Sequence, residues 1–102
     1  MRLIAAGAAL VLLLALAAQA APSAGQRVTL TGCAVPGVTA ACLMMRSADG
    51  TVYDITGVTP RPRVFDRMIR VRGTTSDKAG ICNQGIVLER IRWSRTRQQC
   101  SN

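Results

Sequence analysis

Hydrophobic and polar residues alternate in several short stretches of this chain, which is the pattern of half-buried β-strands. Residues 27–31 show it most clearly, because Val28 and Leu30 fall on one face and Thr29 and Thr31 on the other. Similar stretches predict four further strands, at residues 41–46, 51–56, 68–73 and 85–93. No long stretch repeats with the period of an amphipathic helix, so the pattern predicts an all-β fold.

Glycine and proline separate the predicted strands. Gly32 permits a bend, and residues 36–37 (Pro-Gly) break the chain and begin a loop. Residues 48–50 (Ala-Asp-Gly) predict a tight hairpin turn with Gly50 at positive φ. Residues 59–62 contain two prolines, which favour an extended connection, and a short helical turn is expected near residues 65–68.

The last two predicted strands combine an apolar face with a basic face. The residues on the inward parity are Ile69, Val71, Ile91 and Trp93. The residues on the outward parity are Arg70, Arg72, Arg90 and Arg92. Glu89 would fall inward if the alternation were regular, so a β-bulge is expected near residues 88–89.

Five short strands with a longer connection between the third and fourth predict a small, closed or partly closed OB-like β-barrel. A small β-sandwich is the alternative. The domain spans residues 27–102, and residues 94–102 form a polar basic tail held by Cys100.

The first 20 residues have the layout of a secretory signal peptide. Arg2 precedes an apolar run at residues 3–18, and residues 18–20 (Ala-Gln-Ala) form a small-x-small cleavage pattern. The run has 16 residues, whereas an uncleaved membrane anchor needs about 20. Residues 30–33 have the letters of a bacterial lipoprotein box, but they do not directly follow the apolar run. We therefore expect cleavage after Ala20, a flexible leader at residues 21–26, and an exported product that is periplasmic or secreted.

All four cysteines follow the predicted cleavage site: Cys33, Cys42, Cys82 and Cys100. In an exported domain of this size they predict two disulfides. A structural zinc site normally has closely spaced ligand pairs, but the chain has no C-x-x-C pair and no histidine. No metal or cofactor is expected.

Short runs of glycine, cysteine and neighbouring residues between positions 28 and 93 resemble a family. The runs are Thr31-Gly32-Cys33, Cys42-Leu43, Asp49-Gly50 with Tyr53, Val71-Arg72-Gly73 and Cys82-Asn83-Gln84-Gly85. The chain resembles a group of small secreted bacterial proteins of unknown function that have a signal peptide and an OB-like barrel. The resemblance implies no catalytic or ligand-binding residue.

In the resembling proteins, the cysteine pair that matches Cys42 and Cys82 is the more regular one. An OB-like barrel also brings the loop between strands one and two to the same end as the loop between strands four and five. Both points favour Cys42–Cys82, which leaves Cys33 with Cys100. The alternative pairing is Cys33–Cys42 with Cys82–Cys100, which needs only a bridge across the first hairpin.

The chain is strongly basic, with 13 Lys and Arg residues against 5 Asp and Glu and a net charge of +8. Without residues 1–20, which include Arg2, 12 cations and 5 anions leave +7. Every cation after Arg2 except Lys78 is arginine, which forms two-pronged contacts with carboxylates and phosphates.

The outward arginines of the last two strands form one candidate basic patch, because these strands are antiparallel neighbours in an OB-like barrel. The candidate binding residues are Arg70, Arg72, Arg90 and Arg92, with Arg95 and Arg97 as an extension. An ordinary solvated face, with Glu89 and Asp66 nearby, is the alternative interpretation. The usual ligand face of the fold, on strands two and three, offers only Arg46 and Tyr53.

The catalytic inventory predicts that the chain is not an enzyme. It has no histidine, and its acidic residues are scattered. Asp54 and Glu89 lie on neighbouring strands, but salt bridges with arginine are a simpler role than a glycosidase pair. Three aromatic residues are few for a protein that stacks on nucleic-acid bases.

The predicted partner is an anionic envelope polymer or a lipid headgroup. A protein-interaction module is the first alternative and an OB-type nucleic-acid binder the second.

Overall fold

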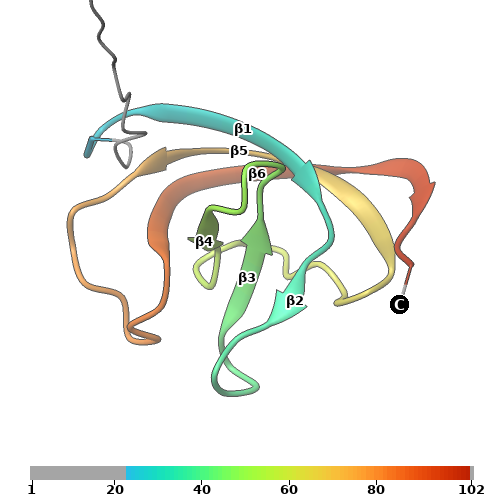
Figure 1. Ribbon diagram of the computed structural model, residues 1–102, viewed down its shortest axis with the longest axis horizontal. Helices are drawn as coiled ribbons and strands as arrows, with labels where there is room; N and C mark the ends of the chain where they lie inside the picture. Colours follow the sequence, from blue (N-terminus) through green and yellow to red (C-terminus); the bar gives the residue numbers. More distant parts are fainter. Residues whose placement is uncertain (1–22, 102) are drawn as a thin grey trace, which may run out of the picture.

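The computed structural model describes residues 23–101, which form six β-strands and no helix. The strands are β1 (Arg27–Gly32), β2 (Val35–Pro36), β3 (Leu43–Arg46), β4 (Val52–Asp54), β5 (Arg67–Thr75) and β6 (Ile86–Gln99). They make one mixed sheet in the order β1-β5-β6-β4-β3-β2, in which β4 and β6 are the parallel pair (Figure 1). The all-β prediction is confirmed. The helical turn expected near residues 65–68 is not formed, and the predicted signal peptide lies outside the described residues.

The sheet is strongly curved but not closed. Strands β1, β5 and β6 arch over β2, β3 and β4 (Figure 1), and the two edge strands, β1 and β2, are separated by only two residues. β2 pairs with β3 for two residues and ends at Pro36, which has no N–H for a longer ladder. The fully closed form of the predicted barrel is therefore wrong, and a sixth short strand lies where residue 36 was expected to begin a loop.

Residues 23–26, part of the predicted flexible leader, are hydrogen-bonded to the end of β5. The Gly25 N–H donates to the Thr75 carbonyl at 2.7 Å, and the Gln26 N–H donates to Thr75 Oγ1 at 3.0 Å. The Thr75 hydroxyl donates in turn to the Ser23 carbonyl. These four residues are thus tied to the sheet, contrary to the expectation of a flexible segment.

The predicted polar tail is also different, because β6 continues to Gln99 and pairs with the start of β5. This half of β6 is mostly exposed on both faces, so its sequence lacks the apolar alternation by which strands are recognised. The Cys33–Cys100 disulfide and a 2.9 Å hydrogen bond from the Cys100 N–H to the Asp66 carbonyl hold its end.

The hydrophobic core lies inside the arch. Its most deeply buried members come from three segments of the chain: Leu43 and Met45 from β3, Ile55 just after β4, and Val71 from β5. Leu30 from β1 and Leu88 from β6 are buried in the same core. Apolar burial of this kind is the main favourable term in folding, and in this chain it follows the alternation of β1, β3 and β5.

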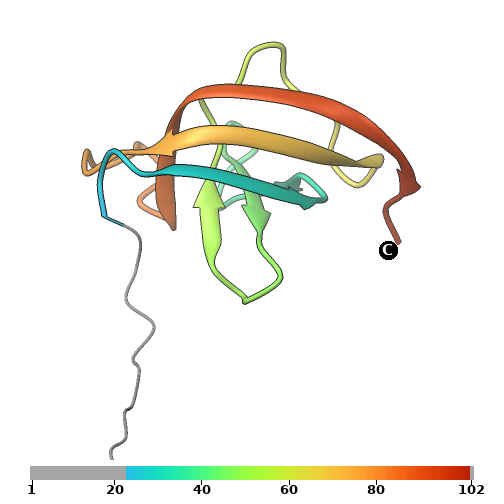
Figure 2. The same ribbon diagram turned by 90° about the horizontal axis from the view of Figure 1, so that it is seen from above.

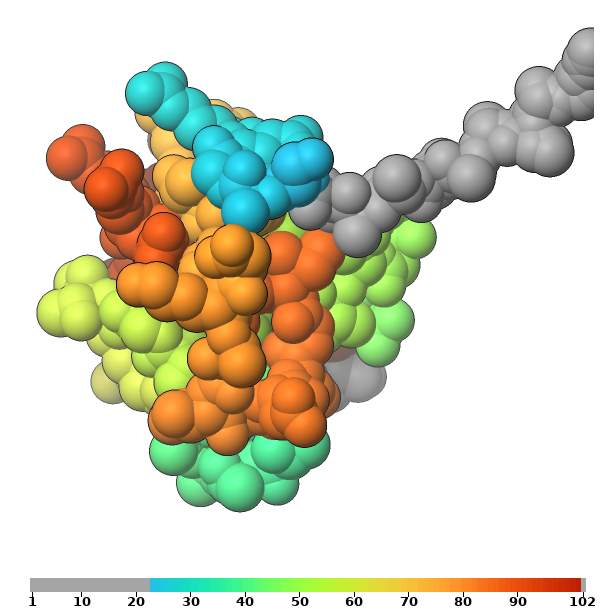
Figure 3. All heavy atoms as spheres, turned by 90° about the vertical axis from the view of Figure 1, so that its left-hand side faces the viewer, coloured from blue at the N-terminus to red at the C-terminus, as the bar shows by residue number. Residues whose placement is uncertain are grey.

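A second, smaller cluster covers the opposite face of β3. Met44 packs there against Cys42 and Cys82. The two cysteines form a disulfide that joins the loop of residues 37–42 to the loop of residues 76–85, and these loops lie against each other in Figure 3. Both observed disulfides, this one and Cys33–Cys100, follow the pairing that the sequence favoured. Disulfides of this kind persist in oxidising compartments.

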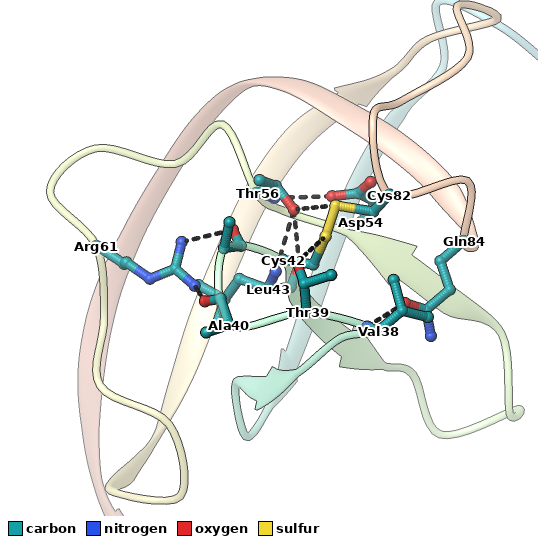
Figure 4. Close-up of a disulfide and its surroundings, with 11 residues drawn as sticks. Val38, Thr39, Ala40, Cys42, Leu43, Asp54, Thr56, Arg61, Cys82 and Gln84 are labelled. Atoms are coloured by element: carbon teal, nitrogen blue, oxygen red, sulfur yellow. Dashed lines mark hydrogen bonds between the residues drawn. A yellow bond between two sulfur atoms is a disulfide. The ribbon is translucent and has the colours of Figure 1, made fainter.

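Polar contacts reinforce the Cys42–Cys82 end (Figure 4). The Thr56 hydroxyl contacts Cys82 Sγ at 3.4 Å and also accepts a hydrogen bond from the Leu43 N–H at 3.0 Å. The Arg61 guanidinium donates to the carbonyl oxygens of Ala40 and Ala41 at 3.1 and 3.2 Å. This end of the molecule is therefore a cross-linked, hydrogen-bonded unit. No helix in the described part of the chain is long and apolar enough to cross a membrane.

A β-bulge separates the two parts of β6. Arg72 is in register with Arg92, and Thr74 with Glu89, so β6 holds one extra residue over this interval. Arg90 takes up the extra residue with a φ of 55°. The bulge confirms the sequence prediction, and it leaves Leu88 buried and Glu89 exposed.

Candidate functional site

The four arginines predicted from the alternation lie on the outer face of β5 and β6. Arg70, Arg72 and Arg92 are exposed and alternate with buried or half-buried residues, while Arg90 is exposed on the bulge. The register places Arg72 directly opposite Arg92, and Arg70 opposite Ser94. The structure thus brings together the residues that the sequence selected.

β1 adds a fifth arginine that the prediction missed. Thr29 and Thr31 are in register with Arg72 and Arg70, so the exposed side chains of β1 continue the same outer face. Arg27 has the parity of Thr29 and lies opposite Thr74. The alternation of residues 27–31 already contained this signal, but only the pairing of β1 with β5 shows that it belongs to the arginine face. We call the surface formed by Arg27, Arg70, Arg72, Arg90 and Arg92 the arginine face.

The central feature of the arginine face is a like-charge pair. Arg72 and Arg92 are cross-strand neighbours, and like charges in that position destabilise a sheet. Within residues 23–101, the arginine side chains that donate hydrogen bonds are those of Arg46 and Arg61, and none belongs to the arginine face. The guanidinium groups of Arg72 and Arg92 are therefore open to an external anion.

Two shallow grooves flank this pair. One has a volume of about 400 Å³ and is lined by Arg27, Thr29, Arg72, Arg90 and Arg92, among others. The other has a volume of about 230 Å³ and is lined by Arg70, Arg72, Arg92, Trp93 and Ser94. The Arg72–Arg92 pair lines both grooves. Alternate residues on a strand are roughly 6.7 Å apart, so the grooves present guanidinium groups at repeated intervals along β5.

Arg95 does not extend the arginine face, contrary to the prediction from the sequence. It is in register with Ile69, a core residue, and its guanidinium carbon lies 5.7 Å from the centre of the Trp93 ring. Arg95 and Trp93 therefore share the opposite face of β6, where a cation–π contact holds them together. Arg97 is exposed and lies within a second register shift, which spans residues 67–69 of β5 and 95–99 of β6.

On the other candidate ligand face, formed by β3 and β4, Arg46 and Tyr53 do not form an exposed binding pair. Tyr53 is buried in the core, and burial, followed by the charge of Asp49, raises the pKa of its hydroxyl. Arg46 donates to the Gly50 carbonyl at 3.4 Å and so belongs to the hairpin turn. The outer side of β3 is occupied instead by the packing of Met44 against the Cys42–Cys82 disulfide.

The two strand carboxylates are in different surroundings. Asp54 is buried, and its Oδ1 accepts a 2.9 Å hydrogen bond from the Thr56 N–H. Glu89 is exposed on β6. Over residues 23–101, no three side chains of His, Cys, Asp or Glu gather as metal ligands would.

The hairpin between β3 and β4 carries an acid, Asp49, whose pKa is strongly lowered. Hydrogen bonds from the Ser47 hydroxyl and the Thr51 N–H lower the pKa of Asp49 to about 2. Asp49 therefore stays ionised in all but strongly acidic solution.

Comparison with known proteins finds no family model, no curated protein and no solved structure that matches this chain.

Proposed function

We propose that this chain is an exported, disulfide-bonded, OB-like binding module whose arginine face holds an anionic component of the cell envelope. The observation that carries the proposal is the exposed Arg72–Arg92 pair, which has a groove on each side. A facing pair of like charges costs stability unless something compensates it, and a bound anion would do so.

The OB-like assignment is supported by the order of the strands. β1 and β2 lie at opposite edges of the sheet, yet only two residues separate them, as two halves of one bent strand would require. The parallel pairing of β4 with β6 and the longer connection before β5 also fit this type of barrel.

Export is supported by the signal-like residues 1–20 and by the two disulfides. Export in turn favours a partner in the envelope. Phosphate and carboxylate groups on a polymer or on lipid headgroups share the chemistry that guanidinium groups recognise.

Nucleic-acid binding has less support. OB-type binders stack bases on aromatic side chains, but Tyr53 is buried and the ring of Trp93 is held by Arg95 and by a hydrogen bond from Nε1 to the Pro60 carbonyl at 2.7 Å. Without a stacking platform, DNA would be only one more polyanion. A protein-interaction role is supported by a different surface, the free edge of β1.

The test is binding by the full chain, with intact disulfides, to immobilised polyphosphate, to phosphatidylglycerol vesicles and to single-stranded DNA over a series of salt concentrations. We expect binding that weakens as salt rises, because ion pairs at the surface are screened. The three ligands separate the sources: preference for polyphosphate indicates a polymer, preference for vesicles a headgroup, and preference for DNA the nucleic-acid alternative.

The matched variants are Arg72→Ser with Arg92→Ser, and Arg63→Ser with Arg97→Ser. Both remove two exposed positive charges, but only the first pair lies at the centre of the arginine face. We expect the first to weaken binding by at least roughly tenfold, and the second by much less. Equal losses in the two variants, or no binding at low salt, would overturn the proposal.

A further inference from the structure

The free side of β1 is a second surface with unused binding capacity. β1 is an edge strand, and its hydrogen-bonding parity follows from its register with β5. The Thr75 N–H donates to the Gln26 carbonyl at 2.9 Å, so the backbone of Gln26 is directed toward β5. Because residues directed toward the neighbouring strand alternate along an antiparallel ladder, Val28 and Leu30 bond to β5.

The intervening residues of β1 direct their backbone groups away from β5. These residues are Arg27, Thr29 and Thr31. Among residues 23–101, no hydrogen-bond partner satisfies their N–H and C=O groups on the free side. An exposed row of this kind is a template for an added strand.

A groove of about 570 Å³ runs beside this edge. One wall is β1 itself, and the other is formed by Tyr53 and by residues 47–49 of the hairpin between β3 and β4. The hairpin projects beyond the free edge of β1 in Figure 2. At the end of β1 the two walls come into contact, because a Cβ on Gly32 would lie at an ordinary van der Waals distance, 3.4 Å, from the Arg46 carbonyl oxygen.

We propose that the free edge of β1 binds an extended acidic segment of a partner protein as an added β-strand. Main-chain hydrogen bonds to Arg27, Thr29 and Thr31 would hold the segment, in the manner of β-augmentation. This contact differs from the anion site on the arginine face, because it uses backbone groups of β1 and the adjoining groove.

The charges around the edge define the side-chain pattern of the segment. Alternate side chains of an added strand would lie beside Arg27 on the outer face, where β5 contributes Arg70 and Arg72. Those positions favour aspartate or glutamate. The remaining side chains would point into the groove lined by Leu30 and Tyr53, where small apolar residues fit. Asp49, also in the groove lining, disfavours acidic residues on that side.

A second copy of this chain is a poorer occupant. If two β1 strands paired around Thr29, they would extend one sheet and place two arginine faces side by side. The chain is already strongly basic, and repulsion between like surfaces opposes that arrangement. An acidic segment meets the same surface with complementary charge.

The test uses the full chain with intact disulfides and a soluble peptide in which glutamate and valine alternate over seven residues, with a lysine–valine peptide as the charge control. The glutamate peptide should slow hydrogen exchange at the amides of Arg27 and Thr29, relative to the protein alone. Val28 and Leu30, already bonded to β5, should change little. The lysine peptide should leave all four unchanged.

Two variants at one position isolate the edge. Thr29→Pro removes an N–H that points away from β5, so it keeps the β1–β5 ladder. Thr29→Val keeps the N–H and the branched side chain. We expect Thr29→Pro to weaken peptide binding by at least roughly tenfold and Thr29→Val to leave it nearly unchanged.

Polyphosphate binding distinguishes this proposal from the preceding one. Thr29→Pro and Thr29→Val should bind polyphosphate equally, because both keep every guanidinium group, while Arg72→Ser with Arg92→Ser should weaken polyphosphate binding by at least roughly tenfold. Equal peptide affinity of Thr29→Pro and Thr29→Val would overturn the edge proposal, as would the absence of peptide binding. Protection of Arg27 and Thr29 that rises with protein concentration alone would overturn it in favour of a second copy.

Discussion

The two faces of the β5–β6 ribbon contribute to stability in opposite directions. On the inner face, Ile69 and Val71 are almost wholly buried and take part in a core that draws on every long strand. On the outer face, Arg72 and Arg92 stand opposite each other in water. The inner face contributes stability through burial, whereas the outer face gives up a little stability to keep like charges together.

This difference shows where function is to be sought in a chain without catalytic motifs. Packing in the core accounts for Ile69 and Val71 on the inner face. The arginine face has no such explanation, because Thr at these positions would make an equally good or better sheet surface. The arginine face lowers stability and is not required for packing. Binding therefore explains its presence better than folding does.

The largest expected effect comes from the inner face. Val71→Ala removes two methyl groups from a site with 0 % exposure, and we expect the free energy of unfolding to fall by about 2 kcal/mol. Chemical denaturation followed by circular dichroism measures it. The matched control is Arg70→Ala, the preceding residue on the outer face, for which the change should stay within about 0.5 kcal/mol. Similar losses in both variants would contradict the division into two faces.

A middle-sized effect is expected where β6 meets the loop of residues 57–66. Trp93→Phe keeps an aromatic ring but removes the Nε1–H that donates to the Pro60 carbonyl. Loss of one such bond should lower the free energy of unfolding by about 1 kcal/mol. Hydrogen exchange in residues 57–66 should also become faster. A variant with unchanged stability and unchanged exchange would show that this bond does not fix the loop.

The inner and outer faces could be predicted from the sequence because alternation records burial directly. It placed Val71 inside and Arg72 outside, and the parity of Glu89 indicated the bulge that the structure has at Arg90. The order of the strands also brought Cys42 near Cys82. Each of these predictions depends on local burial or on the order of the strands.

The wrong predictions concern strand pairings that produce no alternation of apolar and polar residues in the sequence. Beyond Trp93, β6 is mostly exposed on both sides, so its continuation to Gln99 could not be recognised. A polar sequence of this kind predicts a tail, so it supplies no strand parity by which Arg95 could be placed on the Trp93 side. The open edge of β1 depends on how far β1 diverges from the β3–β4 hairpin, which is a property of the folded sheet.

The smallest expected change is an increase in the free energy of unfolding. It separates the two faces most clearly, because the inner-face substitution lowers the same quantity. Arg72→Thr removes one member of the Arg72–Arg92 pair and supplies a residue with high strand propensity opposite Thr29. We expect the free energy of unfolding to rise by about 0.2–1 kcal/mol, while the affinity for polyphosphate falls. Thr74→Val, on the same strand and at a half-buried site, is the control that alters β5 without altering its charge. Denaturation curves and binding isotherms on the same samples give both quantities. A variant that loses stability would mean that the arginine pair is structural, and the case for an anion site would then lose its main support.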